Sequence, residues 1–214
     1  MIVYGSSMSP YARKVLAFAA EKGIEVESRP IGLGSQDPEF REASPFGKIP
    51  AFRDGDFTLA DSSAIVAYLE AIRPEPALIP NEPKARARAI WYDEFADTIM
   101  GACGTKMFFN RIVAPRFLKR EGDLAVADKA ECEELPPLLD YLERVIPDSG
   151  FLVEDRLTLA DIAVASPFAN FRHLALEWDE ARHGKVKAYV EAILDRPSFK
   201  HLVEREAAFL ARAA

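Results

Sequence analysis

Four prolines close together constrain the fold of this chain more than any other feature of its sequence. Pro74, Pro76, Pro80 and Pro83 occur at a density that neither a helix nor a strand tolerates, because proline lacks an amide N–H and fixes φ. The segment is therefore the best candidate for a linker. A chain of 214 residues is long enough for one large domain or two small ones. We expect two domains, at residues 1–76 and 84–214.

The region before the linker alternates between strand and helix patterns. Strand patterns cover residues 2–4, 24–29, 51–53 and 57–59, and helical patterns cover 10–22 and 62–72. Asp54-Gly55, a strong hairpin signal, joins the third and fourth strands. This order predicts an α/β domain with a mixed sheet covered by helices.

The region after the linker has helical spacing almost throughout. Helical patterns cover residues 84–112, 128–146, 158–175, 184–195 and 197–212. Thr158 and Asp161 have the spacing of a reciprocal capping box, which marks the start of the third of these helices. We therefore expect the second domain to be all-helical.

Composition narrows the function and the cellular compartment. The 27 basic and 34 acidic residues give a net charge of −7, and scattered basic residues argue against a nucleic-acid partner. Cys103 and Cys132 form no CxxC motif, which favours a reducing compartment. A basic leader and a long apolar run are lacking, so we expect a cytoplasmic protein without a membrane partner. The three histidines lack metal-ligand spacing, and we interpret them as surface or helix-end residues. We therefore expect no metal site.

Ser9 is the first candidate site residue. Pro10 suits the first position of a helix, which makes Ser9 the N-cap. Taken alone, a capping role is the simpler interpretation. A hydroxyl and free amide N–H groups at a helix start can also stabilise an anion such as a thiolate, phosphate or carboxylate.

Two later segments carry further candidates. Pro50 stands just before a strand, where a cis Ile49-Pro50 bond would expose the backbone of Ile49 to an extended peptide, although an ordinary trans turn is the commoner arrangement. Asp61 and Ser62 open the helix at 62–72, where capping is again the simpler role. Ser62 and its neighbouring N–H groups can also hold a carboxylate while Asp61 pairs with an ammonium group.

Taken together, these segments resemble the cytosolic glutathione transferases, in particular serine-type, bacterial-like members. The resemblance covers residues 1 to about 200 and rests on motifs that are each weak but occur in one order. The motifs are Ser9-Pro10-Tyr11-Ala12-Arg13-Lys14-Val15, Glu21-Lys22-Gly23-Ile24, Ser44-Pro45-Phe46-Gly47-Lys48-Ile49-Pro50, the helix start from Asp61 to Leu69, the Thr158 capping box and Arg196-Pro197-Ser198-Phe199.

The resemblance implies a fold, ligands and residue roles. It implies a thioredoxin-like N-terminal domain, an all-α C-terminal domain, a homodimer, and glutathione as co-substrate for detoxification of a small electrophile. In such a protein Ser9 donates to the glutathione thiolate, and Ile49, before a cis-Pro50, pairs with the cysteinyl backbone. Asp61 and Ser62 hold the γ-glutamyl end, and Lys48 reaches a ligand carboxylate.

Three positions depart from the family pattern. Lys48 stands where many members have Gln, Ser44 where Asn is usual, and Asp61 where Glu is commoner. The thiolate donor also has alternatives at Ser7, Ser6 and Tyr4, although only Ser9 is both pre-helical and matched to the motif.

The electrophile site and the exact activity stay open at this level. Apolar residues of the helix at 84–112 are candidates for the site, but each is as readily explained by core or interface packing: Trp91, Tyr92, Phe95, Met100, Met107 and Phe108. Transfer of glutathione to a small electrophile is the first hypothesis. Glutathione-dependent isomerisation or dehalogenation is the second, and a non-catalytic ligand-binding or interaction protein of this fold is the third.

Overall fold

The computed structural model describes residues 1–212 and begins with a four-stranded mixed sheet. Its elements are β1 (Ile2–Tyr4), α1 (Pro10–Glu21), β2 (Glu27–Arg29), α2 (Pro38–Ala43), β3 (Ala51–Asp54), β4 (Phe57–Ala60) and α3 (Ser62–Ile72). The strand order is β2-β1-β3-β4, with β1 parallel to β2 and antiparallel to β3. The expected mixed sheet and the hairpin at Gly55 are confirmed.

Helices cover both faces of this sheet. Alternate residues of β1 point to opposite faces, so Val3 joins the main core beneath α1 and α3, whereas Tyr4 packs with Phe40 of α2. Helix α2 was not expected from the sequence. The second strand is shorter than the expected 24–29, because the Ile24 N–H still donates to the carbonyl of Ala19 at the end of α1.

The rest of the described chain is helical, and all four described strands lie before residue 61. Its elements are α4 (Pro83–Glu94), η1 (Phe95–Met100), α5 (Gly101–Phe108), η2 (Phe109–Phe117), α6 (Leu124–Lys129), η3 (Ala130–Glu134), α7 (Leu135–Val145), α8 (Leu159–His173), α9 (Gly184–Leu194) and α10 (Pro197–Arg212), where η marks π-helical segments. The expected helix at 84–112 therefore continues to residue 117, and that at 128–146 begins at residue 124. The Thr158 N–H donates to Asp161 Oδ2 at 2.9 Å, which confirms the capping box.

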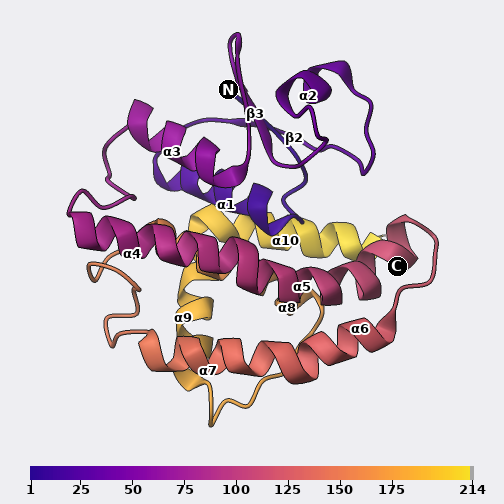
Figure 1. Cartoon of the computed structure of the whole chain (residues 1–214), viewed down its shortest axis with the longest axis vertical. Coiled ribbons are helices and arrows are strands. Elements are labelled where there is room, and N and C mark those ends of the chain that lie inside the picture. The colour runs from indigo at the N-terminus through magenta and orange to yellow at the C-terminus, as the bar shows by residue number, and fades with distance from the viewer. Residues whose placement is uncertain (213–214) are drawn as a thin grey trace.

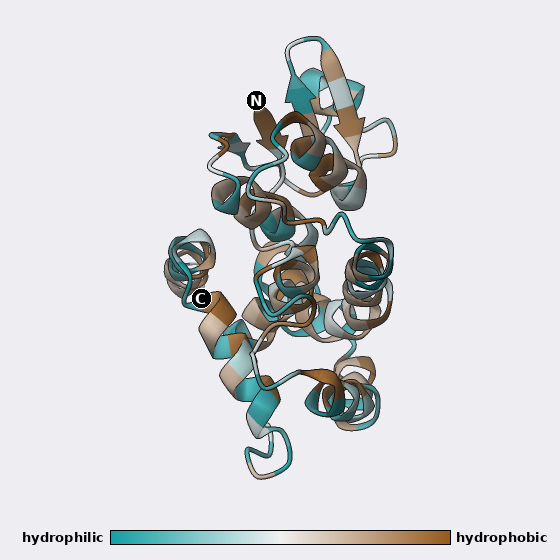
Figure 2. Cartoon of the chain, turned by 90° about the vertical axis from the view of Figure 1, so that its left-hand side faces the viewer, coloured by the Kyte–Doolittle hydropathy of each residue, from teal (hydrophilic) through white to brown (hydrophobic). Residues whose placement is uncertain are grey.

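The sheet and the helical region meet at α1, which packs on α8 and α10 (Figure 1). One continuous apolar cluster runs from Val3 and Phe18 to Phe168 and Phe199, so the two regions share a core. Hydrophilic residues occupy the loops at both ends of the molecule, and hydrophobic residues occur along the strands and central helices (Figure 2). Lys22, at the end of α1, bonds Glu70 and the carbonyls of Pro74 and Pro76, which fastens the proline segment to the sheet region.

Candidate functional site

Three segments that carry the candidate residues meet at one end of the sheet. Tyr4, the last residue of β1, pairs with Ala51, the first of β3, and Ala51 pairs with Ala60, the last of β4. Residues 5–9 leave the sheet after Tyr4, Ile49-Pro50 enters it before Ala51, and Asp61 follows Ala60. The strand register therefore brings together parts of the chain that are far apart in sequence.

Ser9 is the N-cap of α1, with φ −75° and ψ 124°. Its Oγ accepts from the Ala12 N–H at 3.5 Å, a long and therefore weak bond, and Pro10 takes the first helical position. The hydroxyl proton of Ser9 has no acceptor among residues 1–212, and the side chain is only partly buried. This hydroxyl can donate to an anion at the start of the helix.

The alternative donors are placed differently. The Tyr4 hydroxyl donates to Glu39 at 3.3 Å, on the face of the sheet covered by α2. Ser7 is 4% exposed, and its hydroxyl lies near the Glu206 carboxylate and helps lower the pKa of that group. Ser6 Oγ accepts from the Met8 N–H at 3.3 Å and caps no helix. Tyr4 and Ser7 are thus already engaged inside the protein.

The loop before β3 has the cis Ile49-Pro50 bond that the sequence suggested. Lys48 is exposed, and its carbonyl accepts from the buried Ser44 hydroxyl at 2.7 Å. Gly5 has φ +143°, and a Cβ atom there would lie 3.3 Å from Ile49 Cβ and 3.4 Å from Ala12 Cβ. A glycine at position 5 therefore allows the Ile49 loop to approach the first turn of α1.

Asp61 and Ser62 form the start of α3. Asp61 has φ +85°, and its Oδ1 accepts from the N–H groups of Ser63 and Ala64 at 2.9 and 3.1 Å, so the capping role is present. Ser62 Oγ donates to Asp97 Oδ2 at 3.0 Å. The expected pair therefore has a third member from the helical region.

Asp97 was not predicted as a site residue from the sequence. Lys14 Nζ lies 2.6 Å from both Asp93 Oδ1 and Asp97 Oδ2, and Tyr11 donates to the Asp97 carbonyl. Burial raises the pKa of the Asp97 carboxyl, and the charge and hydrogen bond of Lys14 oppose that effect. Two aspartates four residues apart on one helix face were the available signal. Asp97 also lies in a π-helical segment, a feature common at functional sites.

Of the apolar residues considered for the electrophile site, Phe108 packs with Met8, the residue before Ser9. It belongs to a small cluster with Met8, Ile112 and Leu210. Tyr92, Phe95, Met100 and Met107 are buried in the main core, and Trp91 is 49% exposed. Packing therefore explains four of the six residues.

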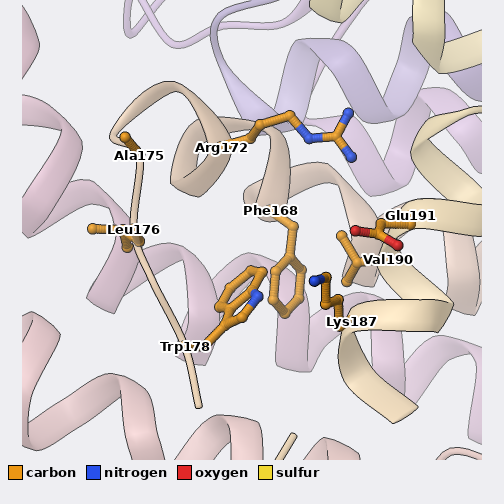
Figure 3. Close-up of a pocket in the computed structure, with 8 residues that line it drawn as sticks. All are labelled: Phe168, Arg172, Ala175, Leu176, Trp178, Lys187, Val190 and Glu191. Atoms are coloured by element: carbon orange, nitrogen blue, oxygen red, sulfur yellow. The ribbon is translucent and has the colours of Figure 1, made fainter. Parts of the chain in front are cut away.

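Two surface cavities, of about 230 and 370 Å³, are lined by none of these candidate residues. The smaller lies between α8 and α9, where the rings of Phe168 and Trp178 pack edge to face at 5.3 Å, and Arg172 and Lys187 also line it (Figure 3).

In the part of the chain that the structure describes, no cluster of three metal-ligating side chains occurs. His173 and His183 lie at helix ends, but their side chains are only 4% exposed, because each contacts a carboxylate. No helix within residues 1–212 is long and apolar enough to cross a bilayer.

Comparison with known proteins decides the family. Residues 3–77 match the model for the N-terminal domain of glutathione S-transferases, and residues 109–206 match that for the C-terminal domain. A glutathione S-transferase of Hyoscyamus muticus is 30% identical over 211 residues, covering 95% of this chain and 98% of that protein. The chain belongs to the glutathione S-transferase family.

Further similarities agree with this assignment. Glutathione S-transferase 3 of Zea mays is 31% identical to this glutathione S-transferase family member, over 94% of this chain and 92% of the relative. A theta class glutathione S-transferase of Xanthomonas axonopodis pv. citri, solved with glutathione bound, superposes with a TM-score of 0.82 at 25% identity, covering 94% of this chain and 96% of that one. The expected fold, a thioredoxin-like N-terminal domain followed by an all-helical domain, is confirmed.

Proposed function

We propose that this protein is a glutathione transferase that activates the glutathione thiol for attack on small hydrophobic electrophiles. The observation that carries the proposal is the Ser9 hydroxyl, which caps α1 and whose proton has no acceptor within residues 1–212. This hydroxyl lies at the end of the sheet where the segments of Ile49 and Ser62 also meet. Family membership supports glutathione as the co-substrate.

Each part of glutathione has a matching group at this end of the sheet. The backbone of Ile49, before cis-Pro50, pairs with the cysteinyl unit. Ser62, whose N–H at the start of α3 is not among those that Asp61 caps, holds the γ-glutamyl carboxylate. Asp61 and Asp97 supply negative charge for its ammonium group, because Asp97 Oδ2 is 3.0 Å from Ser62 Oγ. Lys48, exposed beside Ile49, supplies a cation for the glycyl carboxylate.

Stabilisation of the thiolate needs only modest energy. A free thiol has a pKa of about 8.5, and lowering it by about two units requires roughly 2.7 kcal/mol. A charge-assisted hydrogen bond from Ser9 supplies about 1.5 to 3 kcal/mol, and the start of α1 adds about 0.3 to 1 kcal/mol. Ser9 and the helix end together are therefore sufficient.

The electrophile then binds against the apolar cluster next to Ser9. Met8 directly precedes Ser9 and packs with Phe108, Ile112 and Leu210. The thiolate attacks the electrophilic carbon, a C–S bond forms, and the leaving group departs with the bonding electron pair. Such conjugation fits a role in detoxification.

We also propose a cytoplasmic homodimer. Phe46, in the loop before β3, is 90% exposed, and Ile90 and Trp91 of α4 are 45% and 49% exposed. Large apolar side chains exposed to this extent are typical of protein interfaces. Cys103 and Cys132 are both free thiols, which suits a reducing compartment.

Retention on immobilised glutathione, followed by a conjugation assay with an activated aryl halide, tests the proposal. Retention together with turnover is expected. Retention without turnover would favour isomerisation or dehalogenation with the same thiolate. Loss of both would indicate a non-catalytic protein of this fold and overturn the proposal.

A further inference from the structure

A buried polar network connects α1 to the two helices behind it. The Arg13 side chain is 0% exposed, and its Nε and Nη2 donate to the two carboxylate oxygens of Glu206 at 3.2 and 2.6 Å. Its Nη1 donates to Asn170 Oδ1 at 2.9 Å and to the Ser166 carbonyl at 2.6 Å. Both ends of the guanidinium are thereby held in one orientation.

The same network reaches the segment that precedes Ser9. Asn170 Nδ2 donates to the Met8 carbonyl at 3.0 Å, and the Ser7 hydroxyl lies near enough to the Glu206 carboxylate to help lower the pKa of that group. His173 Nε2 lies 2.9 Å from the same carboxylate. A residue of α8 therefore bonds Met8, and a carboxylate of α10 lies beside Ser7, the two residues that stand immediately before Ser9.

This contact matters because the strength of a hydrogen bond falls steeply with displacement of the donor. Ser9 Oγ itself has only the long bond to Ala12 to fix it. Catalytic groups must be held within about 0.5 Å of their productive geometry by the residues around them. Local backbone bonds join Ser9 to Ser6 and Arg13, and the Met8 carbonyl is held from α8 by Asn170.

We infer that Glu206 and Asn170 are positioning residues that hold the Met8-Ser9 segment where the Ser9 hydroxyl meets the glutathione thiolate. This inference rests on the proposed function. Leu210, one turn after Glu206 on α10, belongs to the apolar cluster around Met8. Helix α10 thus contacts the Ser9 segment and the proposed electrophile surface with successive turns.

Two variants separate this role from simple packing. Asn170→Asp keeps an acceptor for Arg13 and removes the donor to the Met8 carbonyl. Glu206→Gln keeps the shape of the side chain and removes its negative charge. Glu21→Gln is the control, because Glu21 also ties α1 to the start of α10, through Arg196 and Ser198, but at the opposite end of α1 from Ser9.

The measurement is the pH dependence of the thiolate absorbance of bound glutathione, together with kcat and the KM for glutathione. In Asn170→Asp and Glu206→Gln we expect the pKa of the bound thiol to rise by about one unit, so that kcat below that pKa falls about tenfold. The KM for glutathione should stay within about twofold, and Glu21→Gln should lose stability without changing the thiol pKa.

The outcomes are distinct. An unchanged thiol pKa in folded Asn170→Asp, with a clear rise in Ser9→Ala, would overturn this inference and leave the proposed function intact. An equal rise in Glu21→Gln would also overturn it, because general loosening of α1 would then suffice. If Glu206→Gln does not fold, Asn170→Asp decides alone. Absence of a thiolate signal in the unmodified protein would overturn the proposed function, and this inference with it.

Discussion

The hydroxyl of Ser62 donates to Oδ2 of Asp97 across 3.0 Å and joins the start of α3 to the first long helix of the C-terminal region. The same carboxylate bonds Lys14 Nζ at 2.6 Å.

Replacement of Asp97 by Asn removes the negative charge proposed to face the γ-glutamyl ammonium group. We expect the KM for glutathione to rise about tenfold, the value of one charge-assisted hydrogen bond, with little change in the pKa of the bound thiol. Glu94→Gln, an exposed change in the same helix, should leave the KM unaltered. Steady-state kinetics at varied glutathione concentration measures the KM of both variants. An unchanged KM in Asp97→Asn would exclude Asp97 from glutathione binding.

Ser9→Ala removes the proposed thiolate donor. The pKa of the bound thiol should rise by about one to two units, because one charge-assisted hydrogen bond is lost. Glutathione retention should persist, since the contacts proposed for Ile49 and Ser62 are unchanged. Ser6→Ala is the matched control, three residues earlier in the same segment. A rise in Ser6→Ala but not in Ser9→Ala would transfer the donor role to Ser6.

Gly5→Ala tests the close approach of the Ile49 loop to α1. Gly5 combines φ +143° with neighbours at 3.3 and 3.4 Å, whereas Gly55 has φ +60° and no neighbour within 4 Å. Gly55→Ala should therefore cost only the backbone term, about 1 to 2 kcal/mol. Gly5→Ala should cost more and also weaken glutathione binding. Denaturant unfolding and calorimetric titration with glutathione would show the difference, and equal effects of the two changes would contradict the expectation.

Acid should weaken the contact of α1 with the start of α10. Burial raises the pKa of the Glu21 carboxyl, but the hydrogen bonds from Arg196 and Ser198 and the charge of Arg196 outweigh it and leave the pKa below 4.5. The folded-state pKa is thus depressed, so the stability from Glu21 is present above pH 4.5 and is lost as the pH falls through the folded-state value. Glu21→Gln should be less stable at neutral pH and show a shallower acid decline. Urea unfolding across a pH series tests this, and identical pH slopes would contradict it.

Phe46→Asp should shift the proposed homodimer toward monomer. Phe46 is 90% exposed, and a charge placed in an apolar interface costs binding energy. Leu33→Asp, at a residue that is 66% exposed elsewhere in the N-terminal region, is the control. Sedimentation velocity would report the shift. A monomeric unmodified protein would remove the dimer from the proposal.

Features that depend on near neighbours along the chain could be predicted from the residues alone. Helix α3 begins as expected because the Asp61 side chain accepts from the N–H groups two and three residues further on. The Asp54-Gly55 turn, the Ser9-Pro10 helix start and the Thr158 capping box are likewise local. The boundary between the mixed sheet and the helices could also be predicted, because each proline of the linker restricts only its own backbone and that of its immediate neighbours.

The burial of charged side chains and the composition of the candidate site depend on contacts between distant parts of the chain. Arg13 and Lys14 fall within a helix expected only to present an apolar stripe, yet both are almost fully buried. Their partners lie 193 residues away at Glu206 and 79 residues away at Asp93, and helical periodicity carries no information about contacts at such separations. Asp97 entered the site for the same reason. A charged side chain can be buried only where its partner is brought to it, and that partner is set by how α1 packs against the helices of the second region.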